Sequence, residues 1–336
     1  SILLGNFSYQ DSDLKQKDSP DPAITFDRKL PSDAYSGEAQ YLYRSDKFKM
    51  VTGGGYFDID AEDKVTVNIA TGLPSPPFPA TITQKEKLDR DLDHTNLYAY
   101  TYLDLLKNMT FTLGASGDFF NGDSDDISDE EQFNPKFGIK WNPLENTTIR
   151  AAGFRVLKRT LITDQTLEPT QVAGFNQFFD DVNGTDAWRY GAAIDQRFLK
   201  TLFGGVEYST RDMDVPYNPE PGKVKNVDWD EDILRAYLYW APHRMLALSA
   251  DFLYENFERD EEFAAGAKEV ETSSFPLGVS FFHPSGISAV VTGTYVDQDG
   301  KYERSTQIGV FEDGDDNFWL FDLALNYRLP KRFGFI

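Results

Sequence analysis

Charged side chains stand at every second position in several stretches of the sequence, with apolar residues between them. Because successive side chains of a strand point to opposite faces, each stretch would have one wet face. Such a face can line a path for a polar solute, or its charges can pair across neighbouring strands and stiffen a wall or hold a plug. We favour the pairing role, and we expect the following residues to line a lumen: Arg150, Arg189, Arg197, Arg211, Arg235 and Arg328, with Asp118, Asp195, Glu207, Asp251, Glu255 and Asp322.

A run of carboxylates at residues 123–131 is dense enough to hold calcium, which prefers six to eight oxygen ligands. The run departs from the EF-hand template, because Ile127 occupies a ligand position and Ser128 replaces the required glycine. We expect a solvated loop and keep calcium as the alternative. Its ligands would be Asp123, Asp125, Asp129 and Glu131.

Enzyme chemistry has little support in the sequence. There is no cysteine, so disulfides, thiolate nucleophiles and zinc–thiolate sites are excluded. His94 stands alone, and His243 and His283 each adjoin a proline as turn residues do. The glycines at 53–55 lie in mid-strand without a following helix, which favours a bend or close packing against a plug over phosphate binding. We expect no catalytic residue and no cofactor other than the possible calcium.

The alternation of side chains predicts the fold. In residues 319–329 one face carries Trp319, Phe321, Leu323, Leu325, Tyr327 and Leu329, and the other is mostly polar. Residues 109–115, 188–194, 234–240 and 246–254 repeat the pattern, whereas 149–155 fits worst, because Arg155 falls on the apolar face. Spans of about 9 to 11 residues suit tilted membrane strands better than the strands of a soluble sandwich or propeller.

Aromatic residues at the ends of the apolar faces predict the two membrane interfaces. They are Trp141, Trp188, Tyr190, Trp240, Tyr254, Trp319 and Tyr327. No window has the roughly 18 apolar residues of a spanning helix, so a membrane role requires strands. We therefore predict an all-β, antiparallel transmembrane β-barrel that occupies residues 1–336 as a single domain.

Connections alternate between short and long. Seven short turns centre on residues 45–46, 107–108, 143–146, 200–201, 242–243, 284–286 and 330–331, and seven long loops span about 11–35, 58–94, 119–134, 160–186, 212–231, 258–272 and 297–316. In outer-membrane barrels the short turns face the periplasm and the long loops face outside. Fourteen strands result, and residues 333–336 look like the start of a fifteenth. Bacterial barrels have even strand counts, so we expect at least sixteen strands and an incomplete chain.

The net charge of −22 is unevenly distributed. The seven long loops hold 44 of the 55 acidic residues and 14 of the 33 basic ones, so the remainder has 11 acids and 19 bases. An acidic outer rim would attract a cationic ligand, although such loops can also simply solvate the surface or bind divalent cations that bridge lipid head groups. The charge also argues against a nucleic acid partner.

Two stretches resemble known families. Residues 134–143 (NPKFGIKWNP), followed by 147–155 (TTIRAAGFR), resemble a hairpin of TonB-dependent outer-membrane receptors, which often have N-P-K-x-G, W-x-P, a short turn and T-x-R-A. Residues 167–181 (LEPTQVAGFNQFFDD) are similar to a segment of barrels fused behind tetratricopeptide repeats. The receptor resemblance implies up to 22 strands around an N-terminal plug, with energy supplied through the periplasmic TonB protein. Residues 1–4 carry no signal peptide, so we expect an N-terminal plug or periplasmic domain, and the last strands, to be absent.

The leading hypothesis is an integral outer-membrane transport barrel of the TonB-dependent receptor type, with its long loops extracellular and a charge-lined lumen for solute uptake. Its partners would be outer-membrane lipid, a plug domain and TonB. One alternative is an export pore for polysaccharide or protein, coupled to a periplasmic repeat domain. Another is a structural sleeve for a membrane complex.

Overall fold

A computed structural model describes residues 1–21, 24–70, 81–122, 130–159, 165–220, 223–260, 266–303 and 310–328. This part of the chain contains strands and no helix. The strands are β1 (Ile2–Asp21), β2 (Ile24–Arg44), β3 (Phe48–Ala70), β4 (Thr81–Leu106), β5 (Met109–Gly122), β6 (Glu130–Leu144), β7 (Thr147–Leu157), β8 (Gln171–Val172), β9 (Phe175–Asn176), β10 (Asp186–Leu199), β11 (Leu202–Glu220), β12 (Lys223–His243), β13 (Leu246–Arg259), β14 (Ala267–Phe282), β15 (Ile287–Glu303) and β16 (Phe311–Tyr327).

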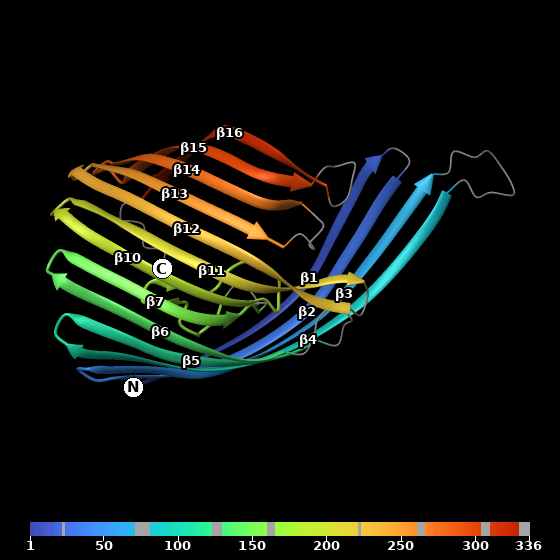
Figure 1. Cartoon of the computed structure of the whole chain (residues 1–336), viewed down its shortest axis with the longest axis horizontal. Helices are drawn as coiled ribbons and strands as arrows, with labels where there is room; N and C mark the ends of the chain where they lie inside the picture. Colours follow the sequence, from blue (N-terminus) through green and yellow to red (C-terminus); the bar gives the residue numbers. More distant parts are fainter. Residues whose placement is uncertain are drawn as a thin grey trace.

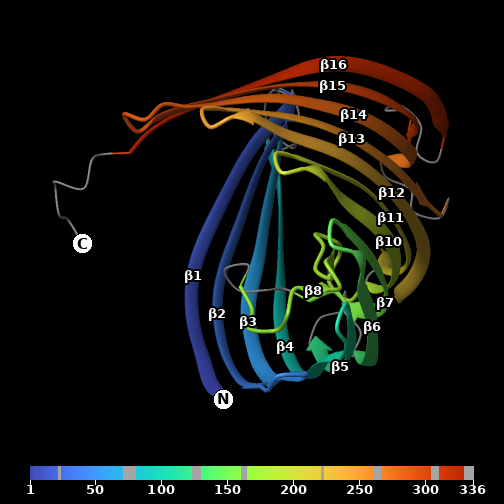
Figure 2. The ribbon, with the colours of Figure 1, turned by 90° about the vertical axis from the view of Figure 1, so that its left-hand side faces the viewer.

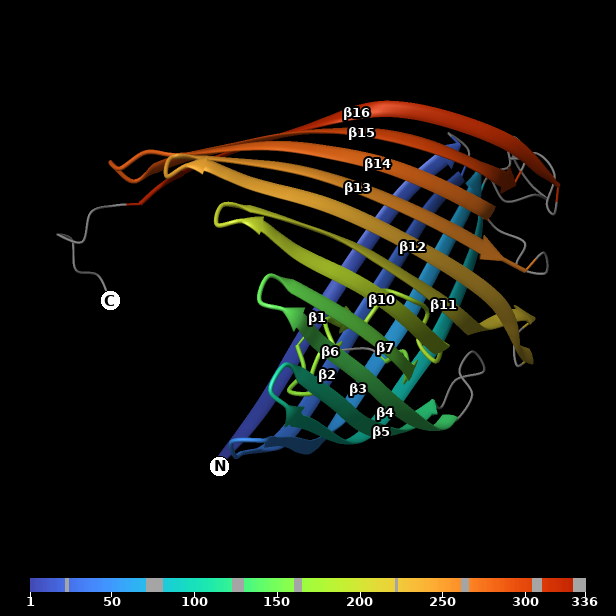
Figure 3. The same ribbon diagram turned by 60° about the vertical axis from the view of Figure 1, so that its left-hand side comes forward.

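Fourteen of these strands form one antiparallel sheet in which each strand pairs with its neighbours in sequence, from β1 to β7 and from β10 to β16. The sheet curls strongly, so that β1–β4 face β12–β16 across the interior (Figures 1 and 3). Its edges are β1 and β16, which do not pair with each other over the described residues (Figure 2). The predicted all-β fold and its fourteen strands are confirmed. Residues 333–336, expected to begin a fifteenth strand, lie outside the described part.

The alternation of side chains separates a polar concave face from an apolar convex one. In β5, Thr112, Ser116 and Asp118 are buried on the concave side, whereas Leu113 is exposed on the convex side. In β10 the buried Arg189 likewise alternates with the exposed Tyr190. Neighbouring strands place residues of the same face opposite each other, so the register extends each face across the sheet.

Most strands of the large sheet are longer than the 9 to 11 residues expected, although β7 has 11. The β3 strand has 23 residues and β4 has 26, so most of the expected loop at 58–94 is strand. The same correction applies to 11–35, where β1 and β2 pair almost to their connection. The physical reason is that backbone pairing needs no apolar face. Where both faces of a strand are wet, the alternation that marks a strand in the sequence disappears.

Short turns join the strands at one end of the sheet, as predicted for 107–108, 143–146 and 200–201 (Figure 1). No helix in the described ranges is long and apolar enough to cross a membrane. A buried apolar cluster combines Tyr98, Tyr100, Phe154 and Ala193 of the wall with Val172 and Phe175, which come from the connection between β7 and β10. This cluster lies where that connection packs on the concave face, and a second buried cluster combines Ala187, Met213, Val215 and Val227 of β10–β12.

Candidate functional site

The connection between β7 and β10 turns back into the curl. Residues 165–185, which we call the inner segment, lie on the concave face, where β8 and β9 pair as a small hairpin (Figure 2). Backbone hydrogen bonds close its neck, from Lys158 N to Thr185 O (2.8 Å) and from Gly184 N to Lys158 O (2.9 Å). The expectation that 160–186 is an outer loop is therefore wrong for its described part. Val172 and Phe175 are the physical reason, because burial on the wall removes both from water.

The hairpin turn gives the inner segment its shape. Ala173 and Gly174 both have positive φ (50° and 94°), as the two central residues of a type I′ turn do. Gln177 N donates to Thr170 O at 3.1 Å, which closes the base of the hairpin. The turn directs Val172 and Phe175 toward the wall and leaves Gln171 and Asn176 exposed.

Glycines in the wall make room for this hairpin. A Cβ added at Gly138 of β6 would lie 2.9 Å from Ala173 Cβ and 3.1 Å from Val172 Cγ1. A Cβ added at Gly191 of β10 would overlap the Phe175 ring. Wall and hairpin are therefore complementary in shape, and a larger side chain at either glycine would displace the segment.

A ladder of arginines on β7, β10 and β11 holds the segment from one side. Arg150 forms ion pairs with Asp195 (2.8 Å) and Glu207 (2.9 Å), and its guanidinium lies 5.3 Å from the centre of the Phe175 ring. Arg150 pairs with two carboxylates of the wall and also contacts the hairpin. Arg150 is thus placed under the turn of the inner segment.

The next two arginines contact the end of the segment. Arg189 donates to Asn176 O (3.1 Å) and Ser209 Oγ (2.8 Å). Arg211 donates to Asp181 (2.8 Å) and Glu231 (2.7 Å). Both guanidinium groups lie against the ring of Phe179, at 4.6 Å for Arg189 and 3.9 Å for Arg211. Cation–π contacts of this kind are strongest where water is excluded.

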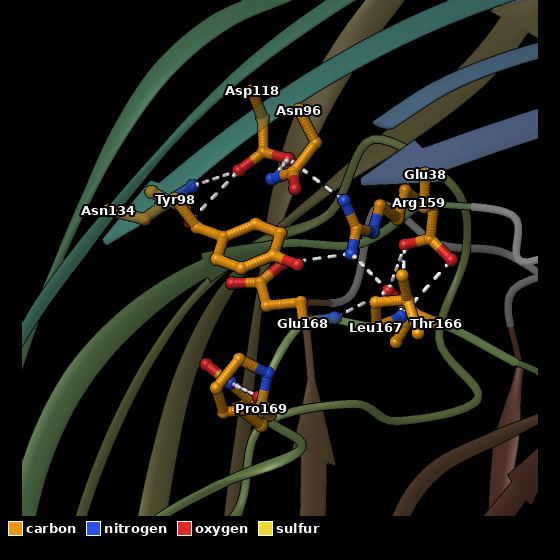
Figure 4. Close-up of polar contacts among 12 residues, drawn as sticks. Glu38, Asn96, Tyr98, Asp118, Asn134, Arg159, Thr166, Leu167, Glu168 and Pro169 are labelled. Atoms are coloured by element: carbon orange, nitrogen blue, oxygen red, sulfur yellow. Dashed lines mark hydrogen bonds and ion pairs between the residues drawn. The ribbon is translucent and has the colours of Figure 1, made fainter. Parts of the chain in front are cut away.

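Arg159, which follows β7, anchors the other side of the segment (Figure 4). Its Nη2 donates to Glu168 Oε2 at 2.8 Å, and its Nη1 lies 3.7 Å from Asp118 Oδ1 of β5. The rings of Phe57 and Phe178 lie on either side of the guanidinium, at 5.4 Å and 5.5 Å. Arg159 is 2% exposed, so this charge depends entirely on protein partners.

The acids that face Arg159 are themselves fully hydrogen-bonded. Asp118 accepts from His94 Nε2 (3.0 Å), Asn96 (2.9 Å) and Asn134 (2.6 Å). Glu168 accepts from Tyr100 Oη at 2.5 Å. Buried carboxylates are stabilised only by such complete sets of donors.

Strand β2 adds a third anchor. Glu38 accepts from Thr166 Oγ1 (2.6 Å) and Leu167 N (3.1 Å), and Gln40 donates to Leu167 O. A Cβ at Gly53 would lie 2.6 Å from Tyr98 Oη, so this glycine admits the Tyr98 ring. Glycines 53–55 were expected to allow close packing, and the group that packs against Gly53 is an aromatic ring of the wall.

The concave face of β12 and β13 is open by comparison. Arg235 of β12 donates to Asp251 (2.9 Å) and Tyr239 Oη (2.8 Å), and its side chain is 48% exposed. Tyr239 also donates to Asp251 (2.9 Å), and the rings of Tyr237 and Tyr239 stack with centroids 5.1 Å apart. Arg235 and Asp251 thus pair with each other within the wall.

The remaining predicted lumen residues are more scattered. Arg197 donates to Asn146 in the β6–β7 turn, at the end of the sheet. Glu255 lies on β13, Asp322 lies on the edge strand β16, and Arg328 follows that strand. The structure therefore brings together only some of the predicted set, with Arg150, Asp195 and Glu207 in one group. Arg159, Glu168, Lys136 and Glu38 were not among the predicted lumen residues, and His94 was expected to stand alone. Arg159 and Glu168 lie on the connection after β7, where no strand alternation applies. Lys136 alternates with the exposed Phe137 in β6, so the same pattern could have identified it.

The predicted interface aromatics lie on the strands as expected from alternation. Trp141, Tyr190, Trp240, Trp319 and Tyr327 have exposed side chains. Trp188 stacks on Tyr190 with ring centroids 5.9 Å apart, and Tyr254 lies on β13. Arg155, the one misfit of the alternation, forms hydrogen bonds with Asp186, from Nε at 2.8 Å.

Acidic residues lie close together near the ends of the strands that are farthest from the short turns. Asp214 lies opposite both Asp186 and Asp228, and Asp230 lies opposite Asp212 and Glu258. Burial and these neighbouring carboxylates raise the pKa of Asp230 above its usual range. Three of the four possible calcium ligands, Asp123, Asp125 and Asp129, lie outside the described residues, and Glu131 lies on β6. No group of three or more potential metal ligands occurs in the described ranges.

Solved structures with a similar fold are TonB-dependent outer-membrane receptors. They include the copper transporter OprC (12% identity, TM-score 0.65, 98% of this chain and 55% of that one). The ferripyoverdine receptor of the outer membrane of Pseudomonas aeruginosa is 10% identical, with a TM-score of 0.59 over 98% of this chain and 48% of that one. The ferric-catecholate import receptor Fiu from E. coli K12 is 10% identical, with a TM-score of 0.56 over 98% and 55%.

At these identities the likeness is one of fold, and the expected resemblance to TonB-dependent receptors is confirmed at that level. The chain spans about half the length of the receptors it matches. No protein-family model matches the sequence, and no curated protein matches it.

Proposed function

We propose that this chain forms the wall of a bacterial outer-membrane barrel of the TonB-dependent receptor type, which takes up a solute through its interior. The single observation that carries the proposal is the curled antiparallel sheet with an apolar convex face and a polar concave face, in the fold of known uptake receptors. A lipid-facing surface explains why large apolar side chains are exposed on the convex side.

The aromatic residues support this membrane placement. Trp319 and Tyr327 lie on the same face of β16, and their separation of eight positions corresponds to about 26 Å along a strand. For a strand tilted by about 40°, this is about 20 Å along the membrane normal. The apolar band of outer-membrane barrels is about 25 Å tall. Outer-membrane lipid is thus one partner, with Trp141 and Trp240 near the turn end and Trp188 and Tyr254 toward the opposite end.

The other partners follow from the receptor type. A plug domain and TonB would control passage, and the charged residues of the concave face would line the path or hold the plug. The acidic rim favours a cation or a cationic complex over an anionic solute. The matched receptors include transporters of copper and of ferric complexes, so a metal-bearing solute is the class to test first. Calcium at 123–131 remains a separate proposal.

The proposal can be tested by deleting the full-length gene in its host. Growth is compared over media that each limit one nutrient, including copper and iron, with and without a protonophore. A nutrient-specific defect that the intact gene restores, and that depends on the proton-motive force, supports uptake. Normal growth in every medium, together with loss of an exported polymer, contradicts it.

One observation favours a second candidate, an export pore coupled to a periplasmic repeat domain. Residues 167–181, which are similar to a segment of barrels fused behind tetratricopeptide repeats, form most of the inner segment. Helical repeats of 34 residues immediately upstream of Ser1 would favour this pore, and a plug domain there would favour the receptor. A structural sleeve would instead copurify with a stoichiometric partner in mild detergent.

A further inference from the structure

We propose that the inner segment is a fixed constriction, which stays clamped to the wall while solute passes and sets the largest solute that the barrel admits. The inference rests on the proposed transport function. It assigns residues 165–185 as a determinant of size selectivity and places the solute path beside them.

The shape of the wall is the first argument for a fixed element. Gly138 and Gly191 lack the side chains that would occupy the space of Val172, Ala173 and Phe175. Strand glycines carry a cost in stability, and here they form a cradle fitted to one conformation of the hairpin. With the segment withdrawn, the buried apolar cluster would lose both Val172 and Phe175.

The charges are the second argument. Arg159, Glu168 and Asp118 are all under 5% exposed and are paired with one another between segment and wall. Moving the segment away would leave both Arg159 and Tyr100 without Glu168. A buried group left without its partner is costly, so displacement in every transport cycle is disfavoured.

The contacts that hold the inner segment come from strands that lie far apart in the sheet. Contacts to the segment come from β2 through Glu38, from β4 through Tyr100, and from β10 and β11 through Arg189 and Arg211. The neck is closed by backbone bonds between Lys158 and residues 184–185. A segment held at both ends and from widely separated strands cannot swing about one hinge.

The open part of the interior is then the solute path. It would run between the exposed Thr170, Gln171 and Asn176 of the segment and the wall around Arg235 and Tyr239. Its lining is hydroxyl, amide and charged, which suits a hydrated polar solute.

Two engineered changes test the proposal in the gene-deleted host. Each is made in the full-length protein and, where a plug domain precedes residue 1, also in a form without the plug, because a plug would itself exclude large solutes. Vancomycin sensitivity is compared in the form without the plug. Gly191→Val pushes Phe175 off the wall, and Phe175→Ala removes the ring without adding bulk. The matched control is Gly37→Val, because a Cβ at Gly37 meets nothing within 4 Å. Assembly is checked by heat-modifiable migration on gels, and permeation is probed by sensitivity to vancomycin, which intact outer membranes exclude.

We expect both variants to be about tenfold more sensitive to vancomycin than the wild type, because overpacking and loss of the anchor release the segment in a large fraction of molecules. The Gly37→Val control should match the wild type. Assembled Gly191→Val and Phe175→Ala barrels that exclude vancomycin as the wild type does would overturn the proposal. The vancomycin test needs no knowledge of the natural solute, so its result does not depend on the uptake experiment.

A crosslink distinguishes a fixed constriction from a moving gate. Val172 Cγ1 lies 3.1 Å from the Cβ that residue 138 would carry, and a disulfide places each sulfur about 3 Å from the far Cβ. The natural chain has no cysteine, so the pair Gly138→Cys and Val172→Cys can be oxidised alone. Ala173→Gly is added to this pair, because the new Cβ at position 138 would otherwise lie 2.9 Å from the Ala173 methyl group and displace the segment. Growth on the nutrient identified above should be unchanged by oxidation. Growth that is lost on oxidation and restored by dithiothreitol would show a gate and overturn the proposal.

Discussion

Two regions of the concave face carry the same kinds of residue, but the residues are buried in one region and more exposed in the other. Around β4–β11, Arg159, Arg189 and Arg211 contact the inner segment and are almost completely buried. On β12 and β13, Arg235 and Asp251 pair within the wall, and the Arg235 side chain stays 48% exposed. An alternating charge pattern therefore specifies a wet face, and a covering segment decides whether those charges anchor structure or remain free to meet a solute.

The largest expected effect comes from removing the central cation of the covered region. Arg159→Ala leaves Asp118 and Glu168 buried without their cation and should lower the free energy of unfolding by about 3 to 5 kcal/mol. Arg235→Ala removes an exposed pair and should cost at most about 1 kcal/mol. Urea unfolding of the full-length protein in lipid vesicles, followed by tryptophan fluorescence, measures both. Equal losses of unfolding free energy in the two variants would contradict the distinction between the two regions.

The next effect concerns the apolar anchor. Phe175 is 1% exposed, and Phe175→Ala should cost about 3 kcal/mol, because it leaves a cavity between segment and wall. Phe281→Ala on the convex face should cost less than about 2 kcal/mol, since lipid fills the space. The same unfolding assay applies. A smaller loss for Phe175→Ala than for Phe281→Ala would mean that the segment is only loosely attached.

A smaller effect is expected at the acidic rim, beyond the apolar band. Burial and neighbouring carboxylates raise the pKa of Asp230, so the folded protein holds this proton more tightly than the unfolded chain does. Stability from this group is therefore present at low pH and is lost as pH rises through the raised pKa. Asp230→Asn should stabilise the protein at neutral pH by less than about 1 kcal/mol, and the gain should vanish below about pH 4.

The matched control for this change is Asp46→Asn, in an exposed turn at the opposite end of the sheet, which should leave the pH profile of unfolding unchanged. A constant gain for Asp230→Asn at all pH values would exclude charge repulsion as its cause.

The smallest effect is expected in the hairpin turn. Ala173 has a φ of 50°, a conformation that costs an alanine about 1 kcal/mol and a glycine much less. Ala173→Gly should therefore stabilise the inner segment by at most about 1 kcal/mol, seen as slower hydrogen exchange of the Gln177 amide, which donates to Thr170 O at the base of the hairpin. Faster exchange would indicate that packing of the Ala173 methyl group near Gly138 stabilises the segment by more than the positive φ of Ala173 destabilises it.

Much of the wall was predictable from the sequence. Alternation at 109–115, 188–194 and 246–254 predicted the strands and their two faces, because a strand with one apolar face and one wet face has a period of two. The number of strands in the sheet, fourteen, was also predicted. The pairing of Arg150 with Asp195 and Glu207 agrees with the preference for structural ion pairs over free charges. The strand ends were missed, since β3 and β4 continue where both faces are polar.

The sequence by itself determined the strands, the orientation of Arg150, Arg189 and Arg211, and the acidic character of the long connections, because each follows from local alternation or composition. Only the tertiary structure decided that residues 165–185 turn inward, that Gly138 and Gly191 receive them, and that Arg159 meets Asp118 across the interior. The physical reason is that a connection carries no period of its own. Its direction is set by surfaces on strands far away in the sequence, which exist only once the sheet has curled.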